Sequence, residues 1–434
     1  MQLSINIWSE LDDTEQDKLL CRPALQNDAE MRDQVASILH DVRNAGDDAI
    51  RRMTETYDGV RIDDIRVSQQ EIAAAKQQLD QAAVDAITLA INNITRFHEQ
   101  QIPQPIAVET MPGVVCERVS QPLDAVGLYV PAGSAPLPSA AIMLAVPAAI
   151  AGCPLRILCT PPRRDVTADP SVLVAASLAN ITEIFTVGGA QAIGAMAYGT
   201  ETLPKVRKIF GPGNAWVTSA KTLVSSDAEG AAIDLPAGPS EVLVIADAGA
   251  SAEFVAADLL SQAEHGPDSQ VLLLTTSESL AREVQSQVEE QLITLSRADI
   301  ARVALESSAI IVVDSVRKAI GISNRYAPEH LILQIADARG TLADIRNAGS
   351  VFVGAWSPES AGDYCSGTNH VLPTYGHATT YSGLGVDQFM RSMTIQELSR
   401  DGLEGIGGAI TALAKLEGLD AHAAAVTRRL EAKS

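Results

Sequence analysis

The sequence predicts an α/β protein whose strands form two parallel sheets. From Ala125 to Val353, short β-branched runs alternate with helical stretches, which is the pattern of βαβ units. The nine strand candidates are many for a single sheet. The chain has 434 residues, which is too long for one ordinary hydrophobic core. We therefore expect two packed units.

The predicted strands share a short length, a high content of Val, Ile and Leu, and flanking turn residues. In chain order they are Ala125–Val130, Arg156–Thr160, Glu183–Val187, Lys208–Phe210, Glu241–Asp247, Gln270–Thr275, Ile310–Val313, Leu331–Ile335 and Ser350–Val353. The helices between them share apolar residues that recur three or four positions apart. They are Ser139–Ala151, Ser171–Ala179, Ala190–Ala197, Asn214–Val224, Ser251–His265, Leu280–Leu295, Ser315–Arg325 and Ala338–Asn347.

The first 110 residues are rich in helix formers. Ser68 and Glu71 have the spacing of a capping box, which predicts a helix that runs toward Leu79. The range Ala83–Gln101 has helical periodicity and ends before Pro103. This part of the chain is therefore predicted to be helical.

After Gly354 the alternation stops. Residues 355–390 are rich in Gly, Ser, Thr and Tyr, which indicates a long functional loop region. Thr394 and Glu397 have the spacing of a second capping box. The remainder is predicted to be helical, with a turn marked by glycines. These are Gly402, Gly405, Gly407 and Gly408. The tail has too little apolar surface for its own core, so we expect it to pack on another unit or another subunit.

Composition excludes several classes of protein. The net charge of −22 repels phosphate backbones and anionic membranes, so neither nucleic acid nor membrane is expected as a partner. No apolar stretch reaches 18 residues, and the N-terminus lacks the basic and apolar regions of a signal peptide. The 5 cysteines are scattered and form no CxxC motif, which favours a reduced cytoplasmic compartment.

Gln262 and His265 are three residues apart near the end of a predicted helix, so both face the same side. Gly266-Pro267 ends this helix. The amide oxygen and the imidazole nitrogen therefore point together at the edge of a unit. This arrangement indicates a place where a metal ion joins them.

Glu329-His330 follows Pro328 and precedes a predicted strand. At the entry to a strand, adjacent side chains can both border one cleft. A carboxylate beside an imidazole provides two proton acceptors of different basicity, which suits several proton transfers. The alternative is a surface carboxylate next to a structural histidine, and the motif alone does not decide between them.

Asp363 and His370 lie in segments of small residues that let the backbone approach a ligand. The alternative for Asp363 is an Asx turn. Glu417 and His422 flank Gly418 and are predicted to converge after a helix end, unless they are a solvated pair. Gln262, His265, Asp363 and His422 together form a set of nitrogen and oxygen ligands that suits Zn²⁺, with Mn²⁺ or Co²⁺ as alternatives. By contrast, His40 and His98 are in polar helical contexts and are predicted to face solvent.

Two glycine-containing turns follow predicted strands and precede predicted helices. They are Val187–Gln191 and Gly211–Asn214. Their backbone N–H groups are suitable for a pyrophosphate at a helix N-terminus, although tight βα turns need glycine in any case. Tyr129 ends a predicted strand, where it either stacks on a flat ring or packs as an ordinary side chain.

The chain resembles the histidinol dehydrogenases, the NAD- and zinc-dependent enzymes of the last steps of histidine synthesis. The resemblance covers essentially the whole chain and depends on long motifs. These are Ile209–Asn214, Asp234–Leu243, Leu260–Ser269, Ala327–Leu331, Ser357–Tyr364 and Gly367–Pro373. The sequence does not depart from the family pattern at the positions that carry the family's functional residues.

The resemblance implies a role for each of these residues. Zinc binds to Gln262, His265, Asp363 and His422, one ion per subunit. Proton transfer is assigned to Glu329 and His330. Substrate contacts are assigned to Ser240, His370 and Glu417, together with His330 and the zinc ligands. NAD⁺ contacts are assigned to Tyr129, Gln191 and Asn214.

The resemblance also implies an intertwined homodimer of two Rossmann-like domains with small helical or extended terminal segments. The C-terminal segment, which carries Glu417 and His422, reaches the partner's active site. The predicted division has four parts, one of them discontinuous. These are an N-terminal segment 1–25, a discontinuous first domain of 26–128 and 240–380, an inserted second domain 129–239, and a tail 381–434 on the partner.

The activity that the resemblance implies is a four-electron oxidation of L-histidinol to L-histidine via L-histidinal, with two NAD⁺. His330 would accept the alcohol proton, and Glu329 would activate water for the second step. A covalent route through a cysteine is the rival, but Cys153 and Cys159 flank an apolar strand and are expected to be buried and inert. A zinc hydrolase and a non-catalytic metal-binding protein are the other classes that remain open.

Overall fold

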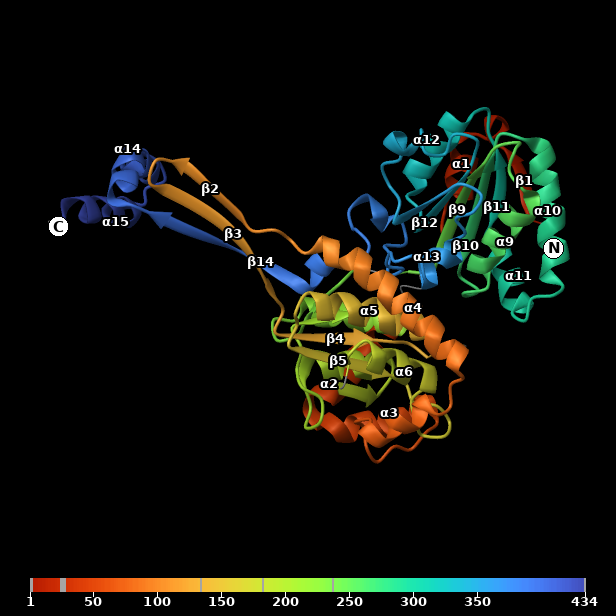
Figure 1. Ribbon diagram of the computed structural model, residues 1–434, viewed down its shortest axis with the longest axis horizontal. Helices are drawn as coiled ribbons and strands as arrows, with labels where there is room; N and C mark the ends of the chain where they lie inside the picture. Colours follow the sequence, from red (N-terminus) through yellow and green to blue (C-terminus); the bar gives the residue numbers. More distant parts are fainter. Residues whose placement is uncertain (1–2, 24–28, 133–134, 182, 236–237, 433–434) are drawn as a thin grey trace.

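The chain folds around two parallel sheets that lie side by side, with a long arm that projects away from both (Figure 1). The structure is a computed structural model that describes residues 3–23, 29–132, 135–181, 183–235 and 238–432. Parts of the predicted segments 1–25 and Asp234–Leu243 therefore lie outside the described residues, as do Lys433 and Ser434.

The first sheet has six parallel strands in the order β1-β11-β10-β9-β12-β13. Its strands are β1 (Ser4–Ile7), β9 (Glu241–Ala246), β10 (Gln270–Thr275), β11 (Ala309–Val312), β12 (His330–Gln334) and β13 (Ser350–Val353). Most of their residues are buried, because helices cover both faces of the sheet. The apolar sides of α9 (Ala252–Ala263), α10 (Glu278–Leu292) and α11 (Ala298–Glu306) pack on one face. The other face is covered by α12 (Val316–Tyr326) and by Leu20, which follows α1 (Asp13–Leu19).

The second sheet has five parallel strands in the order β6-β5-β4-β7-β8. These are β4 (Ala125–Tyr129), β5 (Leu155–Thr160), β6 (Glu183–Thr186), β7 (Lys208–Phe210) and β8 (Ala232–Ile233). One face packs against α3 (Gln69–Lys76), α4 (Gln81–His98), α5 (Pro138–Ile150) and α6 (Pro170–Leu178). The other packs against α2 (Ala29–Met53), α7 (Gly189–Tyr198) and α8 (Ala215–Ser226).

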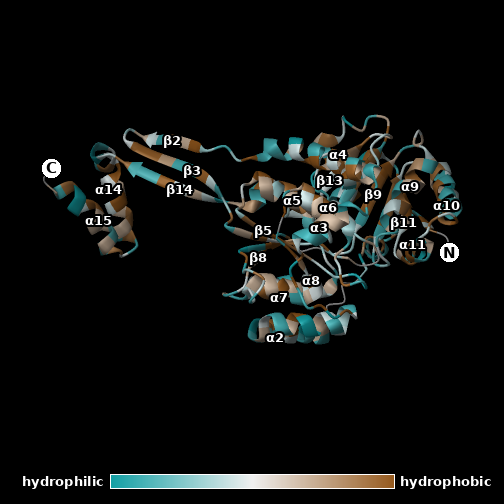
Figure 2. Ribbon diagram, turned by 60° about the horizontal axis from the view of Figure 1, so that its bottom comes forward, coloured by the Kyte–Doolittle hydropathy of each residue, from teal (hydrophilic) through white to brown (hydrophobic). Residues whose placement is uncertain are grey.

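The arm is a three-stranded antiparallel sheet in the order β14-β3-β2, and it ends in two helices. Its elements are β2 (Ile106–Met111), β3 (Val114–Pro122), β14 (Met390–Leu398), α14 (Arg400–Leu416) and α15 (Asp420–Glu431). Figure 2 shows apolar segments along the arm strands and on both helices, far from the two large sheets. Exposed apolar side chains include Val108, Ile395 and Leu416. The arm therefore presents an apolar surface that this chain does not cover.

The remaining elements are short. They are η1 (Trp8–Glu10), η2 (Thr54–Asp58), η3 (Glu99–Gln101), η4 (Leu342–Asp344), α13 (Glu359–Tyr364), η5 (His377–Thr379) and η6 (Val386–Phe389). The segment 355–390 is mostly loop, and α13 lies within it. Within the parts of the chain that the structure describes, no helix is both long and apolar enough to cross a membrane.

All nine predicted strands coincide with strands of the two parallel sheets, so this part of the fold prediction is confirmed. The capping box at Ser68 is also confirmed, because Ser68 Oγ accepts from the Glu71 N–H while the Glu71 carboxylate accepts from the Ser68 N–H. The packing differs from the predicted division in one respect. Helices within 26–128, which we expected to join 240–380, bury their apolar faces on the five-stranded sheet instead. The division into domains stays a proposal.

Three predictions in other segments are wrong. The predicted helix Ala338–Asn347 contains only η4, because Gly340 donates to the Asp337 carboxylate in a turn. Thr394 and Glu397 form no capping box, because they lie in β14 and pair with β3. The N-cap of α14 is Ser399, whose Oγ accepts from the Gly402 N–H. The glycines from Gly402 to Gly408 therefore lie inside α14, and the turn after this helix is at Gly418 instead.

His98 also differs from its prediction. It is buried at the end of α4, where Nδ1 donates to the Ile94 carbonyl at 2.9 Å, and burial lowers its pKa. The periodicity of α4 places His98 four residues after Ile94, on the buried face. His40 is exposed, as predicted.

Candidate active site

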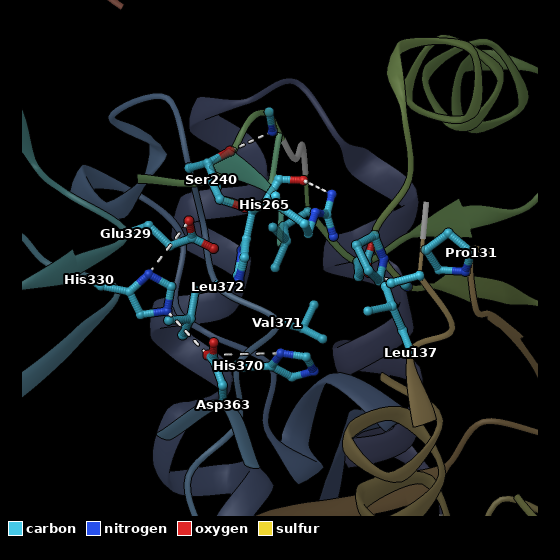
Figure 3. A pocket seen from close by; sticks show the side chains of 18 residues that line it. Pro131, Leu137, Ser240, His265, Glu329, His330, Asp363, His370, Val371 and Leu372 are labelled. Carbon is cyan, nitrogen blue, oxygen red and sulfur yellow. Dashed lines mark hydrogen bonds and ion pairs between the residues drawn. The ribbon is translucent and has the colours of Figure 1, made fainter. Parts of the chain in front are cut away.

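A cavity of about 330 Å³ is lined by residues of both parallel sheets. On one side it is bordered by residues that follow strands of the five-stranded sheet, such as Pro131 after β4 and Gly211 after β7. On the other side are residues at the starts of strands of the six-stranded sheet, such as Ser240 before β9 and His330 in β12. The carboxyl end of one sheet thus faces the amino end of the other. Residues 363–374 close a third side (Figure 3).

The backbone of a single residue, Glu241 at the start of β9, holds both Glu329 and His330. The Glu241 N–H donates to Glu329 Oε2 at 2.8 Å, and the Glu241 carbonyl accepts from His330 Nδ1 at 3.0 Å. Parallel pairing of β12 with β9 brings these groups together. Because a carbonyl can only accept, His330 Nδ1 carries the proton and Nε2 is the free base. Nε2 has no hydrogen-bond partner among the described residues and lies 3.7 Å from Asp363 Oδ1.

Burial shifts the pKa values of Glu329 and His330 in opposite directions, because it disfavours the charged form of each side chain. It lowers the pKa of His330 to about 3, with His265 and His370 adding to the effect. It raises the pKa of Glu329 well above its ordinary value, and the nearby carboxylates of Glu241 and Asp363 raise it further. His330 is therefore a neutral imidazole at pH 7, able to accept a proton at Nε2.

Three of the four predicted metal ligands come together beside the cavity, whose lining includes His265 and Asp363 but not Gln262. Gln262 is in the last turn of α9 and is buried, whereas His265 lies just beyond the helix end and is exposed to the cavity. The Gln262 amide lies 3.4 Å from His265 Nδ1. Asp363, in α13, and His265 offer ligand atoms within 4.8 Å of each other. Asp363 Oδ1 also lies 4.0 Å from His370 Nδ1 (Figure 3).

A further carboxylate, Glu359, belongs to this cluster and was missed by the sequence reasoning. It is the first residue of α13, is 1% exposed, and offers a ligand atom within 4.8 Å of those of His265 and Asp363. Burial raises the pKa of Asp363 to about 7, and burial together with Asp363 and Glu329 raises that of Glu359 well above its ordinary value. Buried carboxylates this close repel one another, and a divalent cation between them would favour their ionised forms. The donor set therefore fits a bound metal ion.

His422 and Glu417 are not part of this cavity. Glu417 is the C-cap of α14 and His422 is in α15; both are exposed at the end of the arm. The cavity lining includes neither residue. The structure of one chain therefore assembles the predicted zinc site without its fourth ligand.

The two remaining predicted substrate contacts line the cavity. Ser240 precedes β9, and its carbonyl accepts from the Gln270 N–H at 3.2 Å. His370 is half-buried, and its Nε2 has no hydrogen-bond partner among the described residues. Burial and the neighbouring His265 lower the pKa of His370 to about 4. Both side chains can therefore form new hydrogen bonds to a small polar molecule.

A second cavity of about 360 Å³ lies at the carboxyl end of the five-stranded sheet and shares Pro131 with the first. The predicted NAD⁺ contacts Tyr129, Gln191 and Asn214 all line it. The Tyr129 hydroxyl accepts from the Gly189 N–H at 3.0 Å, at the first residue of α7. Gly189 has φ +62°, which explains the glycine in this turn. Asn214 is the N-cap of α8 and accepts from the Val217 N–H at 3.2 Å.

Other residues of the second cavity were not singled out from the sequence. Tyr57 and Trp216 are exposed aromatic side chains in its lining, suitable for stacking on a flat ring. Asp58 also lines it, and burial raises its pKa to about 6. Tyr57 and Asp58 lie within 26–128, which was predicted to join the domain of 240–380. The prediction therefore did not place them near Tyr129, Gln191 and Asn214.

The cysteines contribute nothing to either cavity. The lining of the two cavities contains none of them, and all 5 are unpaired. Cys153 and Cys159 are fully buried, as predicted. Burial raises the pKa of the Cys153 thiol to about 11 and raises that of Cys159 still further. Neither thiol can form a reactive thiolate near the cavity.

The chain is similar to known proteins over its whole length. The family model described as histidinol dehydrogenase matches residues 21–430. A histidinol dehydrogenase of Aliivibrio fischeri is 55% identical over 425 residues, covering 98% of this chain and 96% of the relative. One of Xanthomonas axonopodis pv. citri is 56% identical over 423 residues, 98% of each chain. The crystal structure of histidinol dehydrogenase from Elizabethkingia anophelis matches with a TM-score of 0.95 at 47% identity, covering 99% of this chain and 98% of that one.

Proposed function

Because the chain belongs to the histidinol dehydrogenase family, we propose that it oxidises L-histidinol to L-histidine through L-histidinal, with NAD⁺ as the hydride acceptor. The observation that carries this proposal is the pair Glu329 and His330, held by the backbone of Glu241 beside a cluster of side chains that could bind a metal ion. This pair provides a neutral base and a carboxyl group within reach of one substrate carbon. A cytoplasmic location stays a prediction from the cysteine pattern.

The zinc proposal depends on the donor atoms around Asp363. Gln262, His265 and Asp363 would hold one Zn²⁺ per subunit, with His422 of the partner subunit as the fourth ligand. A carboxylate, an amide and imidazoles suit this ion. When bound there, Zn²⁺ supplies a charge that holds the imidazole and the amine of histidinol. The side chains of Ser240, His370 and the partner subunit's Glu417 would contact the rest of the substrate.

The NAD⁺ proposal depends on the second cavity. Tyr129, Gln191 and Asn214 line it at the carboxyl ends of parallel strands, which is where open α/β sheets bind nucleotides. The N-termini of α7 and α8 point their N–H groups toward this end of the sheet and suit phosphates. When bound there, NAD⁺ supplies the acceptor for both hydrides. The shared residue Pro131 provides the point at which the two cavities meet.

The first oxidation needs a base for the alcohol proton. His330 Nε2 is unprotonated, unpartnered and turned toward Asp363, so it would accept this proton as the hydride leaves the same carbon. The product is the aldehyde. A placed base of this kind contributes roughly 10²–10⁴ in rate.

The second oxidation needs a water molecule. Glu329 would accept a proton from water as the oxygen attacks the aldehyde, and protonated His330 would return its proton to the aldehyde oxygen, which gives a hydrate. Once ionised, this carboxylate is a strong base because burial raises its pKa. The hydrate then loses a second hydride and a proton, which gives the carboxylic acid. The Glu241 N–H keeps Glu329 beside the substrate through both steps.

The subunit arrangement that we propose is a homodimer in which each C-terminal tail completes the partner's site. Two observations support it: the arm projects from the rest of the chain with exposed apolar side chains, and Glu417 and His422 are at its end. A tail that packs on a second copy would bury this surface.

The test is the yield of NADH from a limiting amount of L-histidinol, with the purified protein and excess NAD⁺. Two successive hydride transfers predict about two NADH per histidinol, and histidine as the final product. A zinc hydrolase with the same ligands would give no NADH. A yield of about one, with histidinal accumulating, would contradict the second oxidation.

A further inference from the structure

Glu359 is a buried carboxylate that the proposed reaction does not use. It begins α13 and faces the last turn of α9, where Gln262 is fully buried. Gln262 is an amide with an oxygen at one corner and a nitrogen at the other. Only the oxygen can bind a metal ion, because the amide nitrogen has no available lone pair. The orientation of this amide therefore decides whether Gln262 is a ligand at all.

The surroundings of Gln262 select one orientation. An amide oxygen that faced the Glu359 carboxylate would place acceptor against acceptor. With the amide turned, its nitrogen donates to both oxygens of Glu359, at 2.9 Å from Oε2. A buried carboxylate and a buried amide are both satisfied by this bond.

The same orientation decides what faces His265. The corner of the amide on that side lies 3.4 Å from His265 Nδ1. When the nitrogen is directed to Glu359, this corner is the oxygen. An amide oxygen and an imidazole nitrogen then lie side by side, next to the Asp363 carboxylate. This is the donor set that a metal ion needs.

We propose that Glu359 is a positioning residue that holds the Gln262 amide with its oxygen toward the zinc ion. This inference rests on the proposed function, since it requires zinc at Gln262, His265 and Asp363. Hydrogen-bond partners of metal ligands commonly orient the ligand in this way. The rival role is direct ligation by Glu359, whose carboxylate also lies close to His265 and Asp363. The bonds from the Gln262 nitrogen to both carboxylate oxygens favour positioning.

The experiment measures zinc affinity of the full-length protein after metal removal, by competition with a chromophoric zinc chelator. Glu359→Ala is expected to weaken zinc binding about 10–100-fold. Glu359→Gln keeps an oxygen acceptor for the Gln262 amide and should recover most of this loss. Glu359→Leu keeps the buried volume without an acceptor and should also weaken zinc binding about 10–100-fold, so it replaces the alanine variant if that variant does not fold.

Two further variants separate positioning from other effects. In the background of Gln262→Ala, removal of Glu359 should add little loss, because no amide remains to be oriented. Asp47→Asn is the matched control, since Asp47 is a buried acid of α2 that accepts from Thr200 Oγ1 at 2.6 Å and lies outside both cavity linings. Its zinc affinity should equal that of the wild type.

The outcomes are distinguishable. Wild-type protein that binds no zinc contradicts the proposed zinc site itself. Wild-type binding with unchanged affinity in Glu359→Ala and Glu359→Leu overturns the positioning role. Equal losses in Glu359→Gln and Glu359→Ala indicate direct ligation and also overturn it. If the losses of zinc affinity in Glu359→Ala and Gln262→Ala multiply in the double variant, the positioning role is also overturned.

Discussion

Glu329 and His330 are adjacent in the chain, and the backbone of one neighbouring residue, Glu241, holds both side chains. The N–H of Glu241 satisfies the carboxylate, and its carbonyl fixes the protonated nitrogen of the imidazole. The sequence predicted the pair from a carboxylate next to an imidazole at a strand entry. It could not predict which nitrogen is the base, because that depends on the register between β12 and β9.

Replacement of Glu329 by Gln should affect the second oxidation more than the first. The glutamine oxygen can still accept from the Glu241 N–H, so the local fold should persist, but an amide cannot take a proton from water. The expected loss in the conversion of histidinal to histidine is at least about 100-fold. Single-turnover measurements that start from histidinol and from histidinal separate the two steps.

The control for this variant is Asp258→Asn, which also neutralises a buried acid but lies outside the cavity lining. It should leave both steps nearly unchanged. An equal loss of the two steps in Glu329→Gln would mean that Glu329 does not act on water alone.

At the scale of elements, the cluster around Asp363 depends on how two helix ends meet. Sequence periodicity predicted α9 and its end at Gly266, so Gln262 and His265 were expected to point together. The short helix α13 was not predicted, because its six residues lie in a segment rich in small and polar residues. Glu359 was missed for this reason. Only the packing of α13 against α9 brings its side chain to Gln262.

The arm was missed for a different reason. Its strands β2, β3 and β14 have little burial in this chain, so their alternation between apolar and polar residues is weak. The capping-box spacing at Thr394 then suggested a helix where antiparallel pairing with β3 prevails. The strand that pairs with β14 is more than 270 residues away in the sequence, as for Thr394 and Arg118. The spacing of nearby residues therefore could not predict this pairing.

Leu416→Glu should weaken self-association through the arm. Leu416 is 84% exposed at the end of α14, and burial of a leucine in a dimer stabilises it by about 2 kcal/mol. A charge there should raise the dissociation constant of the dimer at least about tenfold. Sedimentation at decreasing protein concentration measures this constant.

The matched control is Ile293→Glu, because Ile293 is 78% exposed but lies at the end of α10, away from the arm. It should sediment like the wild type. If Leu416→Glu also sediments like the wild type, the end of α14 does not lie in a dimer interface.

At the scale of the whole molecule, the candidate active site depends on how the two sheets face each other. The carboxyl end of the five-stranded sheet supplies the second cavity, and the amino end of the six-stranded sheet supplies Ser240 and His330. The sequence predicted two parallel sheets from the alternation of strands and helices. It could not predict which ends of the two sheets face each other, since this depends on the packing of segments far apart in the chain.

The cavity of one chain also lacks a predicted ligand. His422 is at the end of the arm, and the lining includes no residue of α14 or α15. The sequence indicated that the tail has too little apolar surface for a core of its own. The exposed apolar residues of the arm agree with this prediction. The central claim is therefore that a second chain supplies His422.

The most direct test is complementation between two inactive variants, His265→Ala and His422→Ala, produced together with different affinity tags. In a mixed dimer, one of the two sites combines an intact cavity with an intact tail. Random assembly then predicts about a quarter of the wild-type activity for an equal mixture. The pair His265→Ala and Asp363→Asn is the control, and it should recover nothing because both changes affect the same cavity. Purified mixed dimers of the first pair without any activity would contradict the shared site.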